Sequence, residues 1–285
     1  MRARRGRSGA GAPEVGSSCV SPPLTYGTYL RIPELLGLQR CRSDPPEHDE
    51  PLFIIVHQVY ELWFKQLLHE IDSSVRLLGD DRVSQATRLL RRALEILRLL
   101  VQQVRILETM RPQDFLAFRS RLNPASGFQS LQFREIEFCL GMKDPEVLER
   151  LDSPANEVER LRARLTEPSL GDAVDGILER RGFEGAVVVG GASRPEAWRL
   201  RALTQIYTDP DRDAELSALM EVLIEIDESL GLWRYHHVLM VERMIGSKRG
   251  TGGSDGAPYL RGTLDKRAFP DLWRVRTELV PASEG

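Results

Sequence analysis

Apolar residues recur along most of this chain every three or four positions, which is the spacing of one face of an α-helix. The pattern is longest over residues 47–78, where four side chains share a face: Phe53, His57, Tyr60 and Phe64. Acidic residues crowd the start of this segment, where they complement the helix dipole. The spacing therefore predicts one long helix here, with an aromatic stripe that includes a histidine.

Similar spacing predicts the remaining helices, and glycine and proline mark the loops between them. Helices are expected over residues 81–110, 113–122, 131–142, 213–245 and 266–279, with two or three short ones in 145–182. Residues 123–130 and 246–257 are expected to be loops, whereas residues 183–195 fit either a short strand or a buried loop. With no repeat of fixed period, the pattern predicts an all-α, single-domain helical bundle over residues 23–285, after a disordered tail over residues 1–22.

The composition of the chain argues against several classes of protein. The chain has 285 residues, 41% of them hydrophobic, and a net charge of −3. No stretch carries the concentrated basic surface of a nucleic-acid-binding protein. The longest apolar runs, such as residues 52–56, fall far below the ~20 residues that span a membrane. The three cysteines are widely spaced and odd in number, which favours a cytoplasmic protein without disulfides or a cysteine metal cluster.

Two histidines are candidates for chemistry, each with a plainer alternative. His57 lies on the aromatic stripe of the first long helix, where a histidine hydrogen-bonded within the core is the commoner case. His236 and His237 point about 100° apart on a later helix. His237 shares an apolar stripe with Leu230, Met240, Val241 and Met244, and His236 shares a mixed face with Trp233, Leu239 and Arg243. A buried neutral imidazole on such a stripe suits a heme axial ligand or a core histidine, and the stripe favours His237.

An arginine and a threonine are candidates for binding an anion. Arg119 follows Phe115 by four residues beside the loop 123–130, where it could be a solvated surface residue or hold a carboxylate with both arms of its guanidinium. Thr251 lies among Gly250, Gly252 and Gly253 after a helix. The loop does not match a phosphate-binding pattern, but the hydroxyl of Thr251 and a nearby backbone N–H could bind an anionic group.

Four stretches of the chain together resemble the tryptophan 2,3-dioxygenase family. They are LTYGTYL at 24–30, HDEPLFIIVHQVYELWFKQLLHE at 48–70, FRSRLNPASGFQSLQFREIEF at 118–138 and WRYHHVLMVERMIGSKRGTGGSDGAPYL at 233–260, which FPDLWRVRTEL at 269–279 extends. The resemblance runs from about residue 22 to 281 and is loosest over 145–210. Four separated motifs in the family's order and spacing make it specific.

The resemblance implies a function and an assembly. It implies a mostly helical fold around heme b, with O2 as co-substrate, assembled as a homotetramer that is a dimer of dimers. It also implies oxidative opening of the indole pyrrole ring of L-tryptophan to N-formyl-L-kynurenine, the first step of the kynurenine pathway. An alternative is a non-catalytic heme or gas-binding protein. Arg119 and Thr251 argue against it, because such a protein has no use for side chains that hold an amino acid.

The same resemblance implies a role for each candidate residue. His237 matches the axial ligand of the heme iron, and His57 matches the catalytic histidine that hydrogen-bonds the indole N–H. The residues expected to bind substrate are Phe53, His57, Phe115, Arg119 and Thr251, together with Tyr26 and Tyr29 from a neighbouring subunit. Ser126 and Gly127 match a loop over the distal side of the heme.

Two positions depart from the commonest family pattern. His236 precedes the expected ligand where many relatives carry another residue, and Pro51 replaces the usual Met or Leu. Neither belongs to the expected clamp. They leave open a related heme monooxygenase of natural-product biosynthesis, which would convert L-tryptophan or a β-methylated tryptophan to a 2-oxindole.

Overall fold

The computed structural model describes residues 23–151, 154–183, 196–252 and 255–280, in two compact units, Met1–Arg40 and Cys41–Gly285. The described residues form helices and no strand, which confirms the predicted all-α class. The expected tail over residues 1–22 and all but Phe183 of the segment 183–195 lie outside the described residues. No helix in the described ranges is long and apolar enough to cross a bilayer.

The first unit contains two short helices that the hydrophobic pattern did not predict. They are α1 (Tyr26–Leu30) and α2 (Ile32–Leu36), separated by Arg31 at a φ of 52°. Thr25 caps α1, since its hydroxyl accepts from the N–H of Thr28 at 3.2 Å. Neither helix buries a side chain within this unit, and Tyr26 and Tyr29 keep 78% and 72% of their surface exposed.

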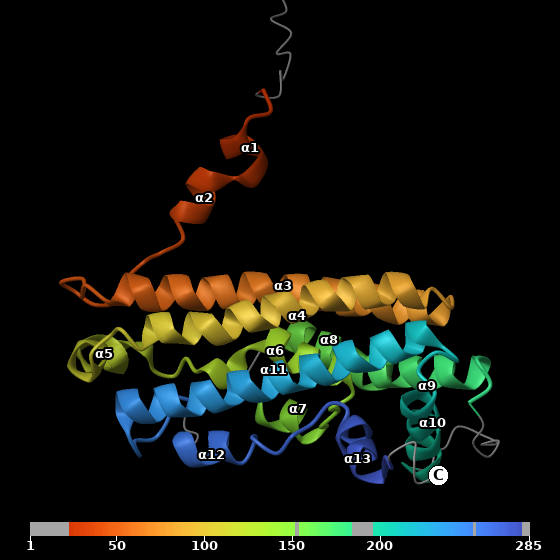
Figure 1. Cartoon of the computed structure of the whole chain (residues 1–285). Helices are drawn as coiled ribbons and strands as arrows, with labels where there is room; N and C mark the ends of the chain where they lie inside the picture. The colour runs from red at the N-terminus through yellow and green to blue at the C-terminus, as the bar shows by residue number, and fades with distance from the viewer. Residues whose placement is uncertain (1–22, 152–153, 184–195, 253–254, 281–285) are drawn as a thin grey trace, which may run out of the picture. The chain divides into compact units, whose positions relative to one another are not determined.

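Three long helices organise the second unit (Figure 1). They are α3 (Glu50–Gly79), α4 (Val83–Leu107) and α11 (Ala214–Ile245), which confirms the helices predicted over 47–78, 81–110 and 213–245. The helix α4 packs along both α3 and α11, so its apolar face is the centre of the core. That face is fully buried at helical spacing: Val83, Ala86, Leu90, Ala93, Leu97, Leu100, Val104 and Leu107.

Shorter helices follow between α4 and α11 along the chain. In chain order they are α5 (Pro112–Arg119), the 3₁₀ turns η1 (Ser120–Leu122) and η2 (Gly127–Gln129), α6 (Leu131–Leu140), α7 (Glu146–Arg150), α8 (Ala155–Thr166), α9 (Leu170–Arg180) and α10 (Glu196–Thr208). Both α6 and α9 pack against α3, and α8 packs against α6. The expected loop 123–130 thus contains one short turn, and the helix α10 was not predicted.

The C-terminal segment returns to α11 through α12 (Ala257–Arg261) and α13 (Pro270–Glu278). The predicted last helix begins four residues later than expected because Pro270 suits the first turn of a helix. The buried carboxylate of Asp227 on α11 accepts from the N–H groups of Ala268 and Phe269, at 2.8 and 3.3 Å, and from Trp273 Nε1 at 2.9 Å. These bonds attach the start of α13 to α11.

Candidate active site

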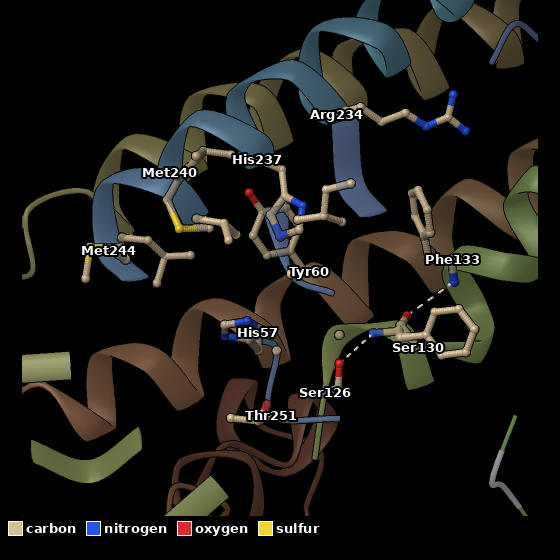
Figure 2. Close-up of a pocket in the computed structure, with 18 of the residues that line it drawn as sticks. His57, Tyr60, Ser126, Ser130, Phe133, Arg234, His237, Met240, Met244 and Thr251 are labelled. Carbon is tan, nitrogen blue, oxygen red and sulfur yellow. Dashed lines mark hydrogen bonds between the residues drawn. The ribbon is translucent and has the colours of Figure 1, made fainter. Parts of the chain in front are cut away.

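A large open cavity lies in the second unit, with α3 on one wall and α11 on another (Figure 2). Its volume is about 300 Å³, within the ~300–1,000 Å³ of pockets for drug-sized ligands. The segments that line it include α3, α5, α6, α11 and the two loops around residues 126 and 251. It brings together residues that are up to 210 positions apart in the sequence, from Phe53 to Thr263.

On the side of the cavity formed by α3, the contacts of His57 define which of its ring nitrogens carries the proton. Its Nδ1 lies 2.7 Å from the carbonyl oxygen of Phe53, one helical turn earlier. A carbonyl only accepts, so Nδ1 carries the proton of the neutral ring and Nε2 keeps its lone pair. His57 faces the cavity and stays accessible there, but the surrounding protein lowers the pKa of His57 by desolvation, against the effects of Phe53 and Glu61. His57 Nε2 therefore offers a hydrogen-bond acceptor to the cavity.

Aromatic rings pack beside His57 and form an apolar slot. The centroid of the Phe53 ring lies 4.1 Å from that of His57 and 5.6 Å from that of Phe115. Phe118 closes the slot from within the core, with its ring 5.4 Å from Phe115 at nearly a right angle. Both Phe53 and Phe115 line the cavity, and together they suit a flat aromatic ligand.

His237 lies on the opposite wall, on α11 (Figure 2). Burial and the neighbouring His57 lower the pKa of His237 to about 4, and no hydrogen bond contributes to this shift. The ring is therefore a neutral imidazole at physiological pH, which is the form that binds metal. Within the described residues no cluster of three His, Cys, Asp or Glu side chains could hold a metal ion.

The predicted faces of α11 need one correction. Trp233 was placed with His236, but its ring stacks on His237, with centroids 5.3 Å apart and planes 7° apart. Residues four apart in a helix lie on one face, which accounts for this pair. Leu230, which was placed on the apolar stripe of His237, is buried in the core, whereas Met240, Val241 and Met244 line the cavity. His236 packs against Tyr235 and is not among the lining residues described.

Two loops meet at the mouth of the cavity and bring Arg119 and Thr251 together. Thr251 donates its hydroxyl to the carbonyl of Ala125 at 2.5 Å, and Arg119 donates from Nη2 to the carbonyl of Arg249. Both side chains line the cavity, as do Ser126 and Gly127. Ser126 caps the turn η2, because its Oγ accepts from the N–H of Phe128 at 3.3 Å. The structure therefore brings Arg119 and Thr251, which come from separate motifs, to the same cavity.

Close contact between the loops depends on a glycine. A Cβ added at Gly252 would lie 2.5 Å from Cβ of Ser126, closer than carbon atoms approach without displacement. Gly256 has a φ of +69°, and a Cβ there would lie 2.6 Å from the carbonyl oxygen of Lys248. These positions explain why the chain places several glycines around Thr251.

The two predicted tyrosines belong to the other unit. Tyr26 and Tyr29 lie in Met1–Arg40, whereas the described lining residues of the cavity come from Cys41–Gly285. Their role at the site of a neighbouring subunit stays a prediction.

Several lining residues were not identified from the sequence. They are Glu61, Arg134, Glu137, Trp233 and Arg234. The signal for Arg134 and Glu137 was available, since both interrupt an otherwise apolar stretch in the helix 131–142. Charged side chains at such positions are usually paired and often mark a site.

Comparisons with known proteins agree with this geometry. The family model described as tryptophan 2,3-dioxygenase matches residues 13–184 and 196–279. Proteins named tryptophan 2,3-dioxygenase include one from Nocardioides sp., 53% identical over 90% of this chain and 95% of its own length. Another, from Herpetosiphon aurantiacus, is 49% identical over 91% of this chain and its own full length. A third, from Anaeromyxobacter dehalogenans, is 47% identical over 92% of this chain and 98% of its own. This chain belongs to the tryptophan 2,3-dioxygenase family.

Proposed function

We propose that this chain is a heme-dependent dioxygenase that opens the indole pyrrole ring of L-tryptophan. Both atoms of O2 enter the product, N-formyl-L-kynurenine, so that substrate and O2 combine without a further reductant. The observation that carries the proposal is the meeting of His57, Arg119, Thr251 and His237 at one cavity. The name that the relatives of this chain share supports tryptophan as the substrate.

The cavity suits heme b as the cofactor. His237 presents a neutral imidazole, which is a suitable axial ligand. Beside it, Met240, Val241 and Met244 form an apolar wall for a flat macrocycle. Two buried nitrogens at the cavity, Arg134 Nε and Trp233 Nε1, have no hydrogen-bond partner among the described residues, which is the state expected where a ligand group completes the site. Bound heme would supply the activation of O2 and the redox chemistry.

The side chains of this protein orient the substrate. Phe53 and Phe115 hold the indole plane, while His57 Nε2 accepts a hydrogen bond from the indole N–H. The guanidinium of Arg119 pairs with the substrate carboxylate, and Thr251 contacts the same charged end. Orientation by these five groups places one edge of the indole ring at a fixed position in the cavity. No proton transfer to His57 is required, because an orienting hydrogen bond is enough.

The loop that carries Ser126 and Gly127 limits access of water to this space. It is joined to α3 through Glu61, whose carboxylate accepts from Ser130 Oγ at 2.6 Å and from Gln132 Nε2 at 2.8 Å. The loop around Thr251 lies against it. Water excluded from the site strengthens the hydrogen bonds that hold the substrate.

The proposal includes a homotetramer built as a dimer of dimers, and a cytoplasmic location. The exposed apolar side chains of α1 and α2 support the assembly, because such side chains are commonly covered by a partner. The free thiols of Cys41 and Cys139 support a reducing compartment.

Mass spectrometry of the product formed under 18O2 tests the reaction. L-Tryptophan should give N-formyl-L-kynurenine that carries two 18O atoms. A 2-oxindole with one 18O atom would contradict the proposal and indicate monooxygenation. A β-methylated tryptophan, supplied in a parallel reaction, reveals whether the modified amino acid is the better substrate.

Absorption spectra of two neighbouring variants test the cofactor assignment. The purified protein should show a Soret band. His237→Ala should lose heme, whereas the matched control His236→Ala should retain it, because His236 does not line the described cavity. Full heme occupancy in His237→Ala would remove His237 as the ligand.

A further inference from the structure

Glu61 lies on α3 one helical turn after His57 and lines the same cavity. Both of its carboxylate oxygens are bonded. Oε1 accepts from Ser130 Oγ at 2.6 Å, and Oε2 accepts from Gln132 Nε2 at 2.8 Å. Gln132 Nε2 also donates to the backbone carbonyl of Glu61 at 2.9 Å. Hydrogen bonds to an ionised acceptor are stronger than those between neutral groups, so one side chain attaches α3 firmly to the start of α6.

Ser130 extends this attachment into the neighbouring loop. Because its hydroxyl donates to Glu61, its oxygen is oriented to accept from the N–H of Phe133 at 3.3 Å, which caps α6. The N–H of Ser130 donates to the carbonyl of Gly127 at 3.2 Å. Ser126 caps the turn η2 within the same loop, and Figure 2 draws both caps as dashed lines. The placement of this loop therefore depends on Glu61.

The second loop is placed against the first. Thr251 donates its hydroxyl to the carbonyl of Ala125, which immediately precedes Ser126. Gly252 lies so close to Ser126 that a Cβ at Gly252 could not fit without displacement. A continuous path of bonds and contacts thus runs from Glu61, through Ser130 and the loop around residue 126, to Thr251. It joins the helix that carries His57 to the loop that carries Thr251.

The two ends of this path hold the two ends of the proposed substrate. His57 accepts from the indole N–H, and Thr251 contacts the amino-acid end. A ligand that bonds to both benefits only if the distance between them matches its own length, since misplacement by about 1 Å is costly. An indole without an amino-acid end bonds at His57 alone and is insensitive to that distance.

We infer that Glu61 is a positioning residue that sets the spacing between the indole-binding and the amino-acid-binding halves of the site. The inference rests on the proposed function, in which the ligand is L-tryptophan. It adds a residue that acts on the substrate through Ser130 and the two loops. Loss of Glu61 should therefore weaken the binding of L-tryptophan selectively.

Two ligands measured on the same variant test this inference. The heme-loaded, full-length protein is titrated by calorimetry with L-tryptophan and with 3-methylindole, which lacks the amino-acid end. Glu61→Gln offers one acceptor oxygen where two are needed, so the Kd for L-tryptophan should rise roughly tenfold. The Kd for 3-methylindole should change less than twofold. A general loss of structure would weaken both ligands alike.

The pH of the titration keeps the charge of Glu61 from complicating the result. Glu61 raises the pKa of His57, so its loss can only lower that pKa. At about pH 8, above the ordinary histidine value of about 6.5, His57 is neutral in every variant. A change in affinity at this pH therefore reflects geometry rather than protonation of His57.

Three further variants locate the effect. Glu61→Gln combined with Gln132→Glu exchanges the carboxylate and the amide, restores matching donors and acceptors, and should recover part of the affinity. Ser130→Ala removes one bond from its other partner and should show the same selective loss, so the test survives if one variant fails to fold. The control Glu228→Gln removes an exposed carboxylate of α11 outside the described lining residues and should leave both Kd values unchanged.

The outcomes separate this inference from the proposed function. Unchanged affinity for L-tryptophan in both Glu61→Gln and Ser130→Ala, or equal weakening of the two ligands, would overturn the positioning role and leave the proposed function standing. An unmodified protein that binds L-tryptophan no more tightly than 3-methylindole, or that binds neither, would overturn both.

Discussion

At the scale of single residues, the surroundings decide which form each side chain takes. Desolvation lowers the pKa of both His57 and His237, yet the two rings differ in their hydrogen bonds and ring contacts at the cavity. The bond from Nδ1 to Phe53 leaves His57 with one acceptor nitrogen, whereas His237 stacks on Trp233. The chemistry of the site follows from these tautomers and contacts as much as from residue type.

The pH dependence of the reaction should reflect the lowered pKa of His57. The acceptor at Nε2 exists only in the neutral ring, and a lowered pKa keeps the ring neutral down to more acidic pH. We therefore expect kcat/KM to be level through about pH 6.5, the ordinary histidine value, and to fall only below it. The profile of His57→Gln, which has no group that titrates there, serves as the comparison. A fall centred at or above pH 6.5 that disappears in this variant would contradict the expectation.

Arg119 should determine the affinity for the amino-acid end of the substrate. Its loss removes a charge-assisted hydrogen bond worth about 1.5–3 kcal/mol, so Arg119→Ala should raise the KM for L-tryptophan roughly tenfold or more. Steady-state kinetics measure this effect, with Arg121→Ala as a control, because Arg121 is exposed two residues further along the chain. An unchanged KM in Arg119→Ala would exclude Arg119 from the clamp.

At the scale of elements, the long helices supply rigid walls and the loops complete the site. Residues of α3 and α11 are placed by helical geometry, since each helix is packed along α4. The loops around residues 126 and 251 are instead placed by each other, through the Thr251–Ala125 bond and the close approach of Gly252 to Ser126. A change in one loop is therefore transmitted to the other.

A single methyl group at Gly252 should disturb this contact. Because Cβ of an alanine would lie 2.5 Å from Cβ of Ser126, the two loops must separate in Gly252→Ala. We expect the KM for L-tryptophan to rise on the order of tenfold, as misplacement of a binding group commonly does, with heme content unchanged. Gly79→Ala is the control, since a Cβ at Gly79 meets no atom within 4 Å. Equal kinetics in the two variants would show that the contact is not needed.

At the scale of the whole molecule, the unit Met1–Arg40 exposes the side chains that the cavity is expected to need. Tyr26 and Tyr29 are aromatic and largely exposed, on helices that bury nothing within their own unit. Short helices without a buried face are stabilised by packing against something else. The proposed tetramer would provide that packing, and the tyrosines of one subunit would serve the cavity of another.

Mixed oligomers can test this exchange of tyrosines. A variant with Tyr26→Ser and Tyr29→Ser should lose activity, and so should Arg119→Ala, each for a different reason. If tyrosines act on a neighbouring subunit, dissociating and reassembling the two variants together should restore activity in part. The restored sites combine an intact Arg119 with intact tyrosines of the other chain. Activity that stays at the level of the separate variants would place the tyrosines within their own subunit or outside the site.

The amount that could be predicted from sequence differs between the fold and the site. The period of apolar positions located α3, α4 and α11, because a long buried face repeats its signal many times. The helices α1, α2 and α12 have five residues each and give no such repetition. The pattern also placed Trp233 on the wrong face of α11, because residues three and four apart are nearly equivalent by periodicity alone.

The sequence by itself determined the helical class, the motifs of the family and the types of residue that are expected to bind an amino acid and a metal. These depend on local spacing, which the order of residues contains directly. Only the tertiary structure decided that Arg119 meets Thr251, that Ser126 touches Gly252, and that Arg134 and Arg234 share Glu137. Each of these pairings joins segments about 100 or more residues apart, and such contacts are selected by the packing of the whole core.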